Sequence, residues 1–190
     1  MSKITEIRWH ARAGQGAVTA AKLVAETALE QDKYFQASPE YGPERMGAPL
    51  QAFTRISDEP INIHCNIVSP DIVIVLDASL LNVVNVTDGL ADDGYVIINT
   101  ELAPAEIRKK SDITKYKVFT VNASRIAMES IGRDFPNIPI LGALLGATGI
   151  MDADKVTSHI RHTFGKKFSE EIVEGNVTAF ERALMEVRGD

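Results

Sequence analysis

The sequence predicts an α/β fold: a mainly parallel sheet flanked by helices, with a short hairpin-like insertion and a helical C-terminal third. Residues 71–77 read Asp-Ile-Val-Ile-Val-Leu-Asp, an aliphatic run bounded by acids that is typical of a strand covered on both faces. Strand-like and helix-like segments alternate up to Asn122, and only helix-like segments follow. A length of 190 residues favours a single domain spanning residues 1–190.

The chain opens with a strand and a helix. Residues 4–9 alternate between apolar and polar side chains and are predicted to form a strand. Residues 17–30 carry small apolar side chains, mostly alanine, at helical spacing, which would let this helix approach a sheet closely. Residues 34–37 are a candidate for a further short strand.

A loop rich in proline and glycine separates this opening from the predicted hairpin. The loop covers residues 39–49 and is long enough to favour a functional role. Residues 51–57 are predicted to be extended, residues 58–60 to turn, and residues 61–65 to form a short strand. We expect the two extended segments to pair as the hairpin.

The middle of the chain supplies the rest of the predicted sheet. Residues 71–77 should be its central strand, followed by a helix over residues 79–86. Residues 95–99 and 117–121 are predicted strands. Between them, residues 104–110 form a predicted helix with proline in its first turn.

The C-terminal third is predicted to cover the sheet and one edge with helices. Asp152 and Ser169 are candidate N-caps for the last two of them. The helix containing residues 140–149 is apolar nearly all round, so it is either core or, if partly uncovered, a subunit interface. The four predicted helices span residues 123–132, 140–150, 154–164 and 169–187.

Charge and hydropathy exclude several classes of protein. The net charge of −6 and a pI near 5.3, with no compensating basic stripe, argue against nucleic-acid binding. The longest apolar stretch, residues 138–147, is shorter than the roughly 20 residues that cross a bilayer. Because the N-terminus lacks the apolar core of a signal peptide, we expect a cytoplasmic protein without membrane contact.

The single cysteine, Cys65, limits the redox chemistry of this chain. One thiol excludes an internal disulfide and cannot alone hold an iron–sulfur cluster, which usually needs four thiolates. We expect Cys65 to be a small, buried or half-buried apolar residue rather than a nucleophile.

The most informative stretch is Arg12-Ala-Gly-Gln-Gly-Ala-Val-Thr19, between the first strand and the first helix. Such a turn can present backbone N–H groups and a positive helix end to an anion. It fits neither a dinucleotide fingerprint, because Thr19 stands where a third glycine or alanine belongs, nor a Walker loop. The alternative is a tight turn that needs glycine only for its backbone angles.

The loop Ser38-Pro-Glu-Tyr-Gly-Pro-Glu-Arg-Met-Gly-Ala-Pro49 is the second informative stretch. Arg45 could bind a carboxylate or phosphate, and Tyr41 could stack or donate a hydrogen bond. The alternative is an ordered surface loop in which Glu44 and Arg45 are solvated. The many backbone constraints favour a functional loop.

Isolated polar residues give weaker signals. His10 could contact a ligand or be a hydrogen-bonded structural residue. His159 and His162 are expected on a solvated helix face, because no acid or cysteine completes a metal site. Asp77 and Asn122 end strands, where they could meet a ligand or cap the next helix. No Ser-His-Asp arrangement or close carboxylate pair is evident.

The two motifs together resemble the gamma subunit of the 2-oxoacid:ferredoxin oxidoreductase family, the pyruvate and 2-ketoisovalerate group. The family turn Gly-x-Gly-Gly-Gln-Gly is matched by residues 11–16, and the family loop Pro-Glu-Tyr-Gly-Pro-Glu-Arg-Arg-Gly-Ala-Pro by residues 39–49. Ala11 and Ala13 replace two family glycines and Met46 replaces an arginine, so the turn could differ in shape and bind anions less strongly.

The resemblance implies a role in CoA-dependent oxidative decarboxylation of a 2-oxoacid to acyl-CoA and CO2, with electrons passed to ferredoxin or a similar acceptor. Pyruvate is the first expectation; a branched or aryl 2-oxoacid, with this chain as a pure scaffold, is the alternative. The weakest reading is a stand-alone nucleotide-binding enzyme.

Within such a complex, alpha, beta and ferredoxin-like delta subunits would hold the thiamine diphosphate, Mg and iron–sulfur clusters, none of them in this chain. The resemblance implies no catalytic residue and no metal ligand here. It implies that the turn and the loop either help hold coenzyme A or brace the catalytic subunits. The implied cofactor-binding residues are Arg12, Gly14, Gln15, Gly16, Tyr41, Glu44 and Arg45.

Overall fold

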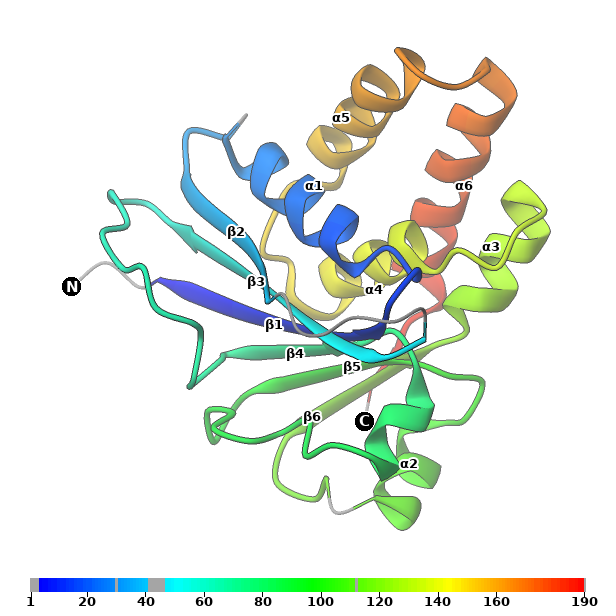
Figure 1. The fold of residues 1–190 in the computed structure, drawn as a ribbon. Coiled ribbons are helices and arrows are strands. Elements are labelled where there is room, and N and C mark those ends of the chain that lie inside the picture. The colour runs from blue at the N-terminus through cyan, green and yellow to red at the C-terminus, as the bar shows by residue number, and fades with distance from the viewer. Residues whose placement is uncertain (1–3, 30, 41–46, 112, 190) are drawn as a thin grey trace.

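A seven-stranded mixed sheet forms the centre of the computed structural model, which describes residues 4–29, 31–40, 47–111 and 113–189 (Figure 1). The strand order is β2-β3-β1-β4-β5-β6-β7. The neighbours β1, β4, β5 and β6 run parallel, whereas β2, β3 and β7 pair antiparallel, so the α/β prediction with a parallel core is confirmed. The strands are β1 (Thr5–Arg12), β2 (Tyr34–Glu40), β3 (Pro49–Ser57), β4 (Ile72–Val75), β5 (Tyr95–Asn99), β6 (Lys117–Val121) and β7 (Arg188–Gly189).

Helices cover both faces of the sheet (Figure 1). Ile72 and Ile74 of β4 pack into one hydrophobic cluster, and the alternate residues Val73 and Val75 pack into another. This two-sided burial explains why the strand is aliphatic at every position. The first face carries α1 (Ala17–Leu29), α3 (Ala123–Ile131), α4 (Asn137–Thr148), α5 (Ala153–Gly165) and α6 (Glu170–Glu186), and the second carries the 3₁₀ helix η1 (Ala78–Asn82) and α2 (Pro104–Lys110).

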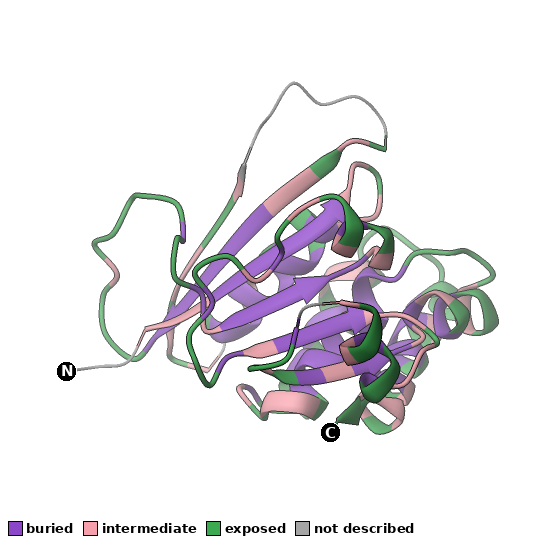
Figure 2. Cartoon of the chain, turned by 90° about the horizontal axis from the view of Figure 1, so that it is seen from below, coloured by how far each residue is buried: buried purple, intermediate pink, exposed green. Residues whose placement is uncertain are grey.

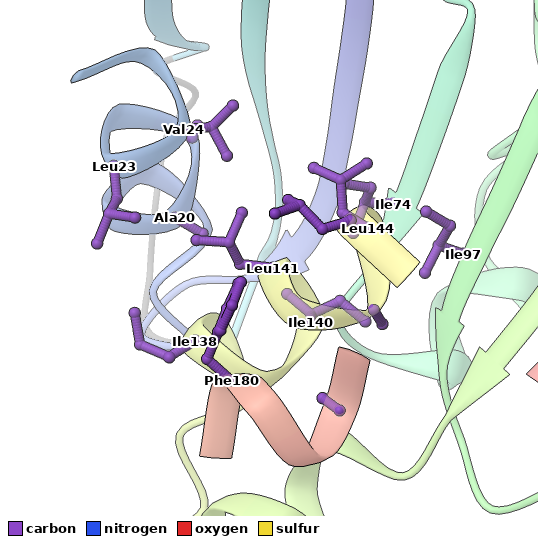
Figure 3. Packing of buried hydrophobic residues seen from close by; sticks show 14 of the residues in the cluster. Ala20, Leu23, Val24, Ile74, Ile97, Ile138, Ile140, Leu141, Leu144 and Phe180 are labelled. Atoms are coloured by element: carbon purple, nitrogen blue, oxygen red, sulfur yellow. The ribbon is translucent and has the colours of Figure 1, made fainter. Parts of the chain in front are cut away.

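Helix α4 lies at the centre of the larger cluster. Figure 3 shows Leu141 and Leu144 between the α1 side chains and the sheet residue Ile74, with Phe180 of α6 close by. Residues 138–145 of α4 are all buried, which confirms the core interpretation of this apolar helix. A Cβ on Gly142 would lie 2.1 Å from the carbonyl oxygen of Phe180, so glycine permits the close contact of α4 with α6.

Several elements have the predicted bounds because their signals are local. Strands β5 and β6 and helix α2 match the predicted ranges. In α2, Pro104 begins the helix and the Glu106 carboxylate accepts a 2.9 Å hydrogen bond from the N–H of Ala103. Asp152 caps α5 as predicted, whereas Ser169 is at the N-cap position of α6 without a side-chain capping bond.

The predicted hairpin is wrong in its second strand. Residues 61–65 form no strand and are mostly exposed. The partner of β3 is instead β2, with Tyr34 opposite Ser57. Because β1 occupies the other edge of β3, no edge remained for residues 61–65. The candidate strand at residues 34–37 is thereby confirmed, and it extends to Glu40.

Three further expectations need correction. The helix expected over residues 79–86 is only the short 3₁₀ helix Ala78–Asn82. A strand does follow Asn122, because β7 pairs with β6 at the end of the chain. Cys65 is exposed rather than buried, since the segment around it is a surface connection. Figure 2 shows this general division between buried strands and exposed connections.

Candidate functional site

The turn between β1 and α1 is built on two glycines with positive φ. The φ angles are 101° at Gly14 and 80° at Gly16, a region that side chains disfavour. The N–H of Gln15 donates to the carbonyl oxygen of Arg12 (3.1 Å), and the Gln15 side-chain oxygen accepts from the N–H of Arg12 (2.8 Å). Gln15 therefore closes the turn twice, once through its backbone and once through its amide.

The two alanines of the turn motif, Ala11 and Ala13, lie at ordinary backbone angles. Among the described residues, Asp32 is the one non-glycine residue with positive φ. Ala11 is within β1, opposite Leu50, and the N–H of Ala13 donates to the carbonyl oxygen of Ala48 at 2.9 Å. Ala11 and Ala13 thus impose no positive-φ strain on the turn.

Asp77 connects the turn to the end of β4. Its Oδ2 lies 3.1 Å from Nε of Arg12 and accepts a 3.1 Å hydrogen bond from Nε2 of Gln15. Its Oδ1 accepts a 2.9 Å bond from the N–H of Ser79, which caps η1. The capping interpretation of Asp77 is confirmed, and the same carboxylate also fixes two predicted site residues.

The electrostatics of this cluster favour the ionised carboxylate. Burial raises the pKa of Asp77, but hydrogen bonds from Ser79 and Gln15 and the positive charge of Arg12 outweigh it, and the pKa is lowered. Arg12 is also bonded to Oγ of Ser79 at 2.9 Å, so its guanidinium is engaged within the fold.

The N-terminus of α1 directly follows the turn. Within the described residues, the N–H groups of Ala17 and Val18 have no hydrogen-bond acceptor, and the first turn of α1 carries no acid. The carbonyl oxygen of Gly16 accepts the first helical bond, from Ala20, at 3.0 Å. This end of the helix can therefore receive a negatively charged group.

The end of the 39–49 loop is anchored to the turn. Arg12 Nη1 donates to the carbonyl oxygen of Gly47 (3.0 Å), and the N–H of Gly47 donates to the carbonyl oxygen of Ala13 (3.3 Å). The two sequence motifs thus meet in space where the loop rejoins β3. The site candidates Tyr41, Glu44 and Arg45 lie outside the described residues.

A polar cleft of about 320 Å³ opens at the carboxyl ends of the parallel strands. The helix that follows β1 packs on one face of the sheet, and the 3₁₀ helix that follows the neighbouring strand β4 packs on the other face. The cleft lies beside this change of face, which is the usual ligand position in open α/β sheets. Asn99 and Ser124, which sequence reasoning missed, hydrogen-bond each other here at 3.0 Å. The signal that could have found them is their position: Asn99 ends β5, and Ser124 lies at the start of the helix that follows β6. The lining residues are Gln15, Leu76, Asp77, Ala78, Asn99, Thr100, Glu101, Asn122, Ser124 and Asp134.

The other polar candidates have structural roles. Asn122 caps α3 by accepting a 3.0 Å bond from the N–H of Arg125. His10 is 3% exposed and accepts a 3.1 Å bond from Nε of Arg8. Burial, followed by the Arg8 charge, lowers the pKa of His10 to about 4, so its imidazole is neutral at physiological pH.

The two helical histidines differ. His162 is exposed as expected, but His159 is only 7% exposed, so the solvated-face prediction is wrong for it. The His159 ring nitrogen Nε2 lies 3.1 Å from Oγ1 of Thr163 and 3.4 Å from Oε2 of Glu26 in α1. The packing of α5 against α1 buries this position.

Two absences hold for the described part of the chain. Its helices include none with the length and apolarity needed to cross a membrane. No group of three or more His, Cys, Asp or Glu side chains is arranged there to hold a metal ion.

Comparisons with known proteins agree across sequence and structure. Residues 6–186 match the family model "Pyruvate ferredoxin/flavodoxin oxidoreductase". The chain is 45% identical to the pyruvate synthase subunit PorC of Thermotoga maritima over 98% of this chain and 96% of that protein. It is 46% identical to the pyruvate/ketoisovalerate oxidoreductases common subunit gamma of Pyrococcus abyssi, covering 93% and 96% of the two chains.

A solved structure is similar over the same extent. The crystal structure of pyruvate oxidoreductase subunit PORC from Thermotoga maritima aligns with a TM-score of 0.88 and 41% identity, covering 99% of each chain. Family model, relatives and fold therefore agree over nearly the whole sequence, so the chain belongs to the pyruvate ferredoxin/flavodoxin oxidoreductase family, as one of its gamma-subunit-type members.

Proposed function

We propose that this chain acts as the gamma subunit of a multisubunit complex that oxidatively decarboxylates a 2-oxoacid. In the overall reaction the 2-oxoacid and coenzyme A become acyl-CoA and CO2, and the electrons released pass to ferredoxin or a similar acceptor. The observation that carries the proposal is the near full-length match to gamma-type subunits at 45–46% identity. A cytoplasmic location is part of the proposal.

Pyruvate is the first substrate that the proposal names. The Thermotoga relative is named for pyruvate, and the Pyrococcus relative is named as common to pyruvate and ketoisovalerate oxidoreductases. Because one gamma subunit serves two 2-oxoacids in that relative, the gamma subunit is not expected to bind the 2-oxoacid side chain. Branched 2-oxoacids therefore belong to the same proposal.

The partners would be alpha, beta and ferredoxin-like delta subunits. These subunits would hold the thiamine diphosphate, Mg and iron–sulfur clusters and supply the redox chemistry. This chain would contribute the β1–α1 turn and the 39–49 loop. Within the turn, the open N-terminus of α1 is suited to an anionic group of coenzyme A.

The predicted site residues take three different parts in this arrangement. Arg12 and Gln15 hydrogen-bond inside the fold, to Ser79 and Asp77 respectively. We assign them to bracing the turn and Gly14 and Gly16 to shaping its backbone, while Tyr41, Glu44 and Arg45 stay candidates for direct contact. The engagement of Arg12 and Gln15 also favours a second candidate function, a scaffold that assembles the complex without touching coenzyme A.

Coenzyme A kinetics of the assembled complex separate the two functions. Arg45→Ala and Gly14→Val should raise the KM for coenzyme A while leaving the KM for pyruvate unchanged if the turn and loop contact the ligand. Gly165→Ala, at an unobstructed position at the end of α5, is the matched control. Unchanged coenzyme A kinetics in both variants would leave the scaffold function.

The reaction itself is tested by purifying the native complex. CoA-dependent reduction of an acceptor with pyruvate, 2-ketoisovalerate and phenylglyoxylate should be greatest with pyruvate. A complex that reduces the acceptor with none of these 2-oxoacids would contradict the proposed function.

A further inference from the structure

An apolar groove of about 630 Å³ is lined by residues of α1 on one side and of the α5–α6 pair on the other. Figure 1 shows these helices on the same side of the sheet. The groove shares no lining residue with the polar cleft, and no motif in the sequence marked it. Four of its lining side chains are large, apolar and unusually exposed for such residues: Val18 41%, Phe135 42%, Phe168 48% and Ile172 42%. Apolar side chains gathered from several elements at one surface are typical of a binding site.

The rim of the groove is basic in a chain of net charge −6. Lys22, Arg133 and Lys167 line it, together with one acid, Glu26. Glu26 lies 3.4 Å from Nζ of Lys22, so that pair is already neutralised. Arg133 and Lys167 form no ion pair within the described residues, which leaves two uncompensated positive charges beside the apolar surface.

A buried amide also faces this groove. Asn137 is 4% exposed and is one of the polar residues that line the groove. An amide can both donate and accept hydrogen bonds, so Asn137 adds a polar group to this largely apolar wall.

The exposure of the rim favours a protein segment over a small molecule. Small-molecule pockets usually enclose most of their ligand. Here Phe135 and Phe168 are still about half exposed at the surface, where a partner's side chains would cover them. The charges of Arg133 and Lys167 are complementary to acidic side chains.

We propose that this groove binds an acidic, amphipathic segment of another subunit of the oxidoreductase complex. The apolar side chains of that segment pack against Phe135 and Phe168, its carboxylates lie against Arg133 and Lys167, and Asn137 hydrogen-bonds its backbone. The inference rests on the proposed function only in naming the partner as a subunit of the same complex.

Photo-crosslinking in the purified complex tests the position of the partner. With p-benzoylphenylalanine placed at Phe168, irradiation should join this chain to one peptide of a partner subunit that contains both acidic and aliphatic residues. The matched control carries the same probe at Val83, 60% exposed beside η1 on the second face of the sheet. Crosslinking to no partner peptide, or to one without acidic residues, would overturn the proposal.

Charge reversal tests the electrostatic part. Arg133→Glu with Lys167→Glu should weaken association with the remaining subunits roughly tenfold at low salt, and the effect should shrink as salt rises. The control, Lys109→Glu with Lys110→Glu at the exposed end of α2, makes the same change in net charge. Equal weakening by both pairs of substitutions would contradict a docking role. Loss of the crosslink from position 168 when coenzyme A alone is added would contradict it as well.

Association of the wild-type chain with its partner subunits separates failure of the proposed function from failure of the groove proposal. If the wild-type chain does not associate with the alpha, beta and delta subunits, the proposed function fails. If it associates normally but the Phe168 probe and the charge reversal have no effect, only the groove proposal fails. Thermal unfolding of each isolated variant confirms that the chain is still folded.

Discussion

The guanidinium of Arg12 and the carboxylate of Asp77 lie 3.1 Å apart and join the ends of two neighbouring parallel strands, β1 and β4. The same guanidinium donates to the carbonyl oxygen of Gly47, where the 39–49 loop rejoins the sheet. One ion pair therefore holds together the turn, the loop end and the edge of the polar cleft.

Asp77→Asn should lower the free energy of unfolding by on the order of 1 kcal/mol at neutral pH. Because the pKa of Asp77 is lowered in the folded chain, its carboxylate stabilises the fold above the unfolded pKa of about 3.9. That contribution is lost as the pH falls through the lower, folded pKa. Urea unfolding at neutral pH and between about pH 4 and pH 2 should show a shallower acid dependence in the variant. Asp58→Asn, at a more exposed pair with Lys33, should change little, and an unaltered Asp77→Asn profile would contradict this role.

Gly16→Ala should destabilise the chain more than Gly14→Ala. Both residues have positive φ, which costs a non-glycine residue about 1–3 kcal/mol. A Cβ at Gly16 would in addition lie 3.0 Å from Phe135 and 3.1 Å from Asn137, whereas nothing lies within 4 Å at Gly14. Chemical denaturation of both variants measures the difference. Equal destabilisation would contradict the prediction, because it would mean that the side chains of Phe135 and Asn137 move aside without an energetic cost.

His10 should make stability fall in mildly acidic solution. Its pKa is lowered from 6.5 to about 4 by burial and by Arg8, so the unfolded chain binds the proton more readily in that interval. The free energy of unfolding should therefore decrease as the pH drops from 6.5 towards 4, by on the order of 3 kcal/mol in total. Urea unfolding across this range and an NMR titration of the imidazole provide the measurement. His162→Gln should leave the dependence intact, and His10→Gln should remove it.

Gly142→Ala should lower the free energy of unfolding by at least the roughly 1–3 kcal/mol that overpacking a core typically costs. The added Cβ would meet the carbonyl oxygen of Phe180 at 2.1 Å, and a backbone atom cannot move aside without shifting α6 away from α4. The matched change Gly165→Ala meets no atom within 4 Å and should be neutral or slightly stabilising. Thermal unfolding compares the two, and a tolerated Gly142→Ala would contradict this close packing of the helices.

The elements that the sequence predicted well have signals contained within a few residues. The aliphatic runs of β5 and β6 and the proline at the start of α2 are readable without knowing any neighbour. The glycine turn before α1 was likewise recognisable, because Gly14 and Gln15 belong to a distinctive motif. Its bonding to Asp77 was not, because 62 positions separate Gln15 from that carboxylate.

The errors concern segments whose state depends on distant partners. Residues 61–65 have strand-like composition, but β1 and β2 occupy both edges of β3. His159 is on a polar helix, but α1 covers its position and places Glu26 beside it. In each case, competition for a strand edge or packing of one helix on another decided the outcome.

By itself, the sequence determined the α/β class, the order of most elements, and the two motifs that indicate the family, because periodicity and short motifs are local properties. Tertiary structure alone decided that Arg12 and Gln15 converge on Asp77, that His10 and His159 are buried, and that Phe135 and Phe168 border the same apolar groove. These are relations between elements far apart in the chain, and they exist only after the helices have packed on the sheet.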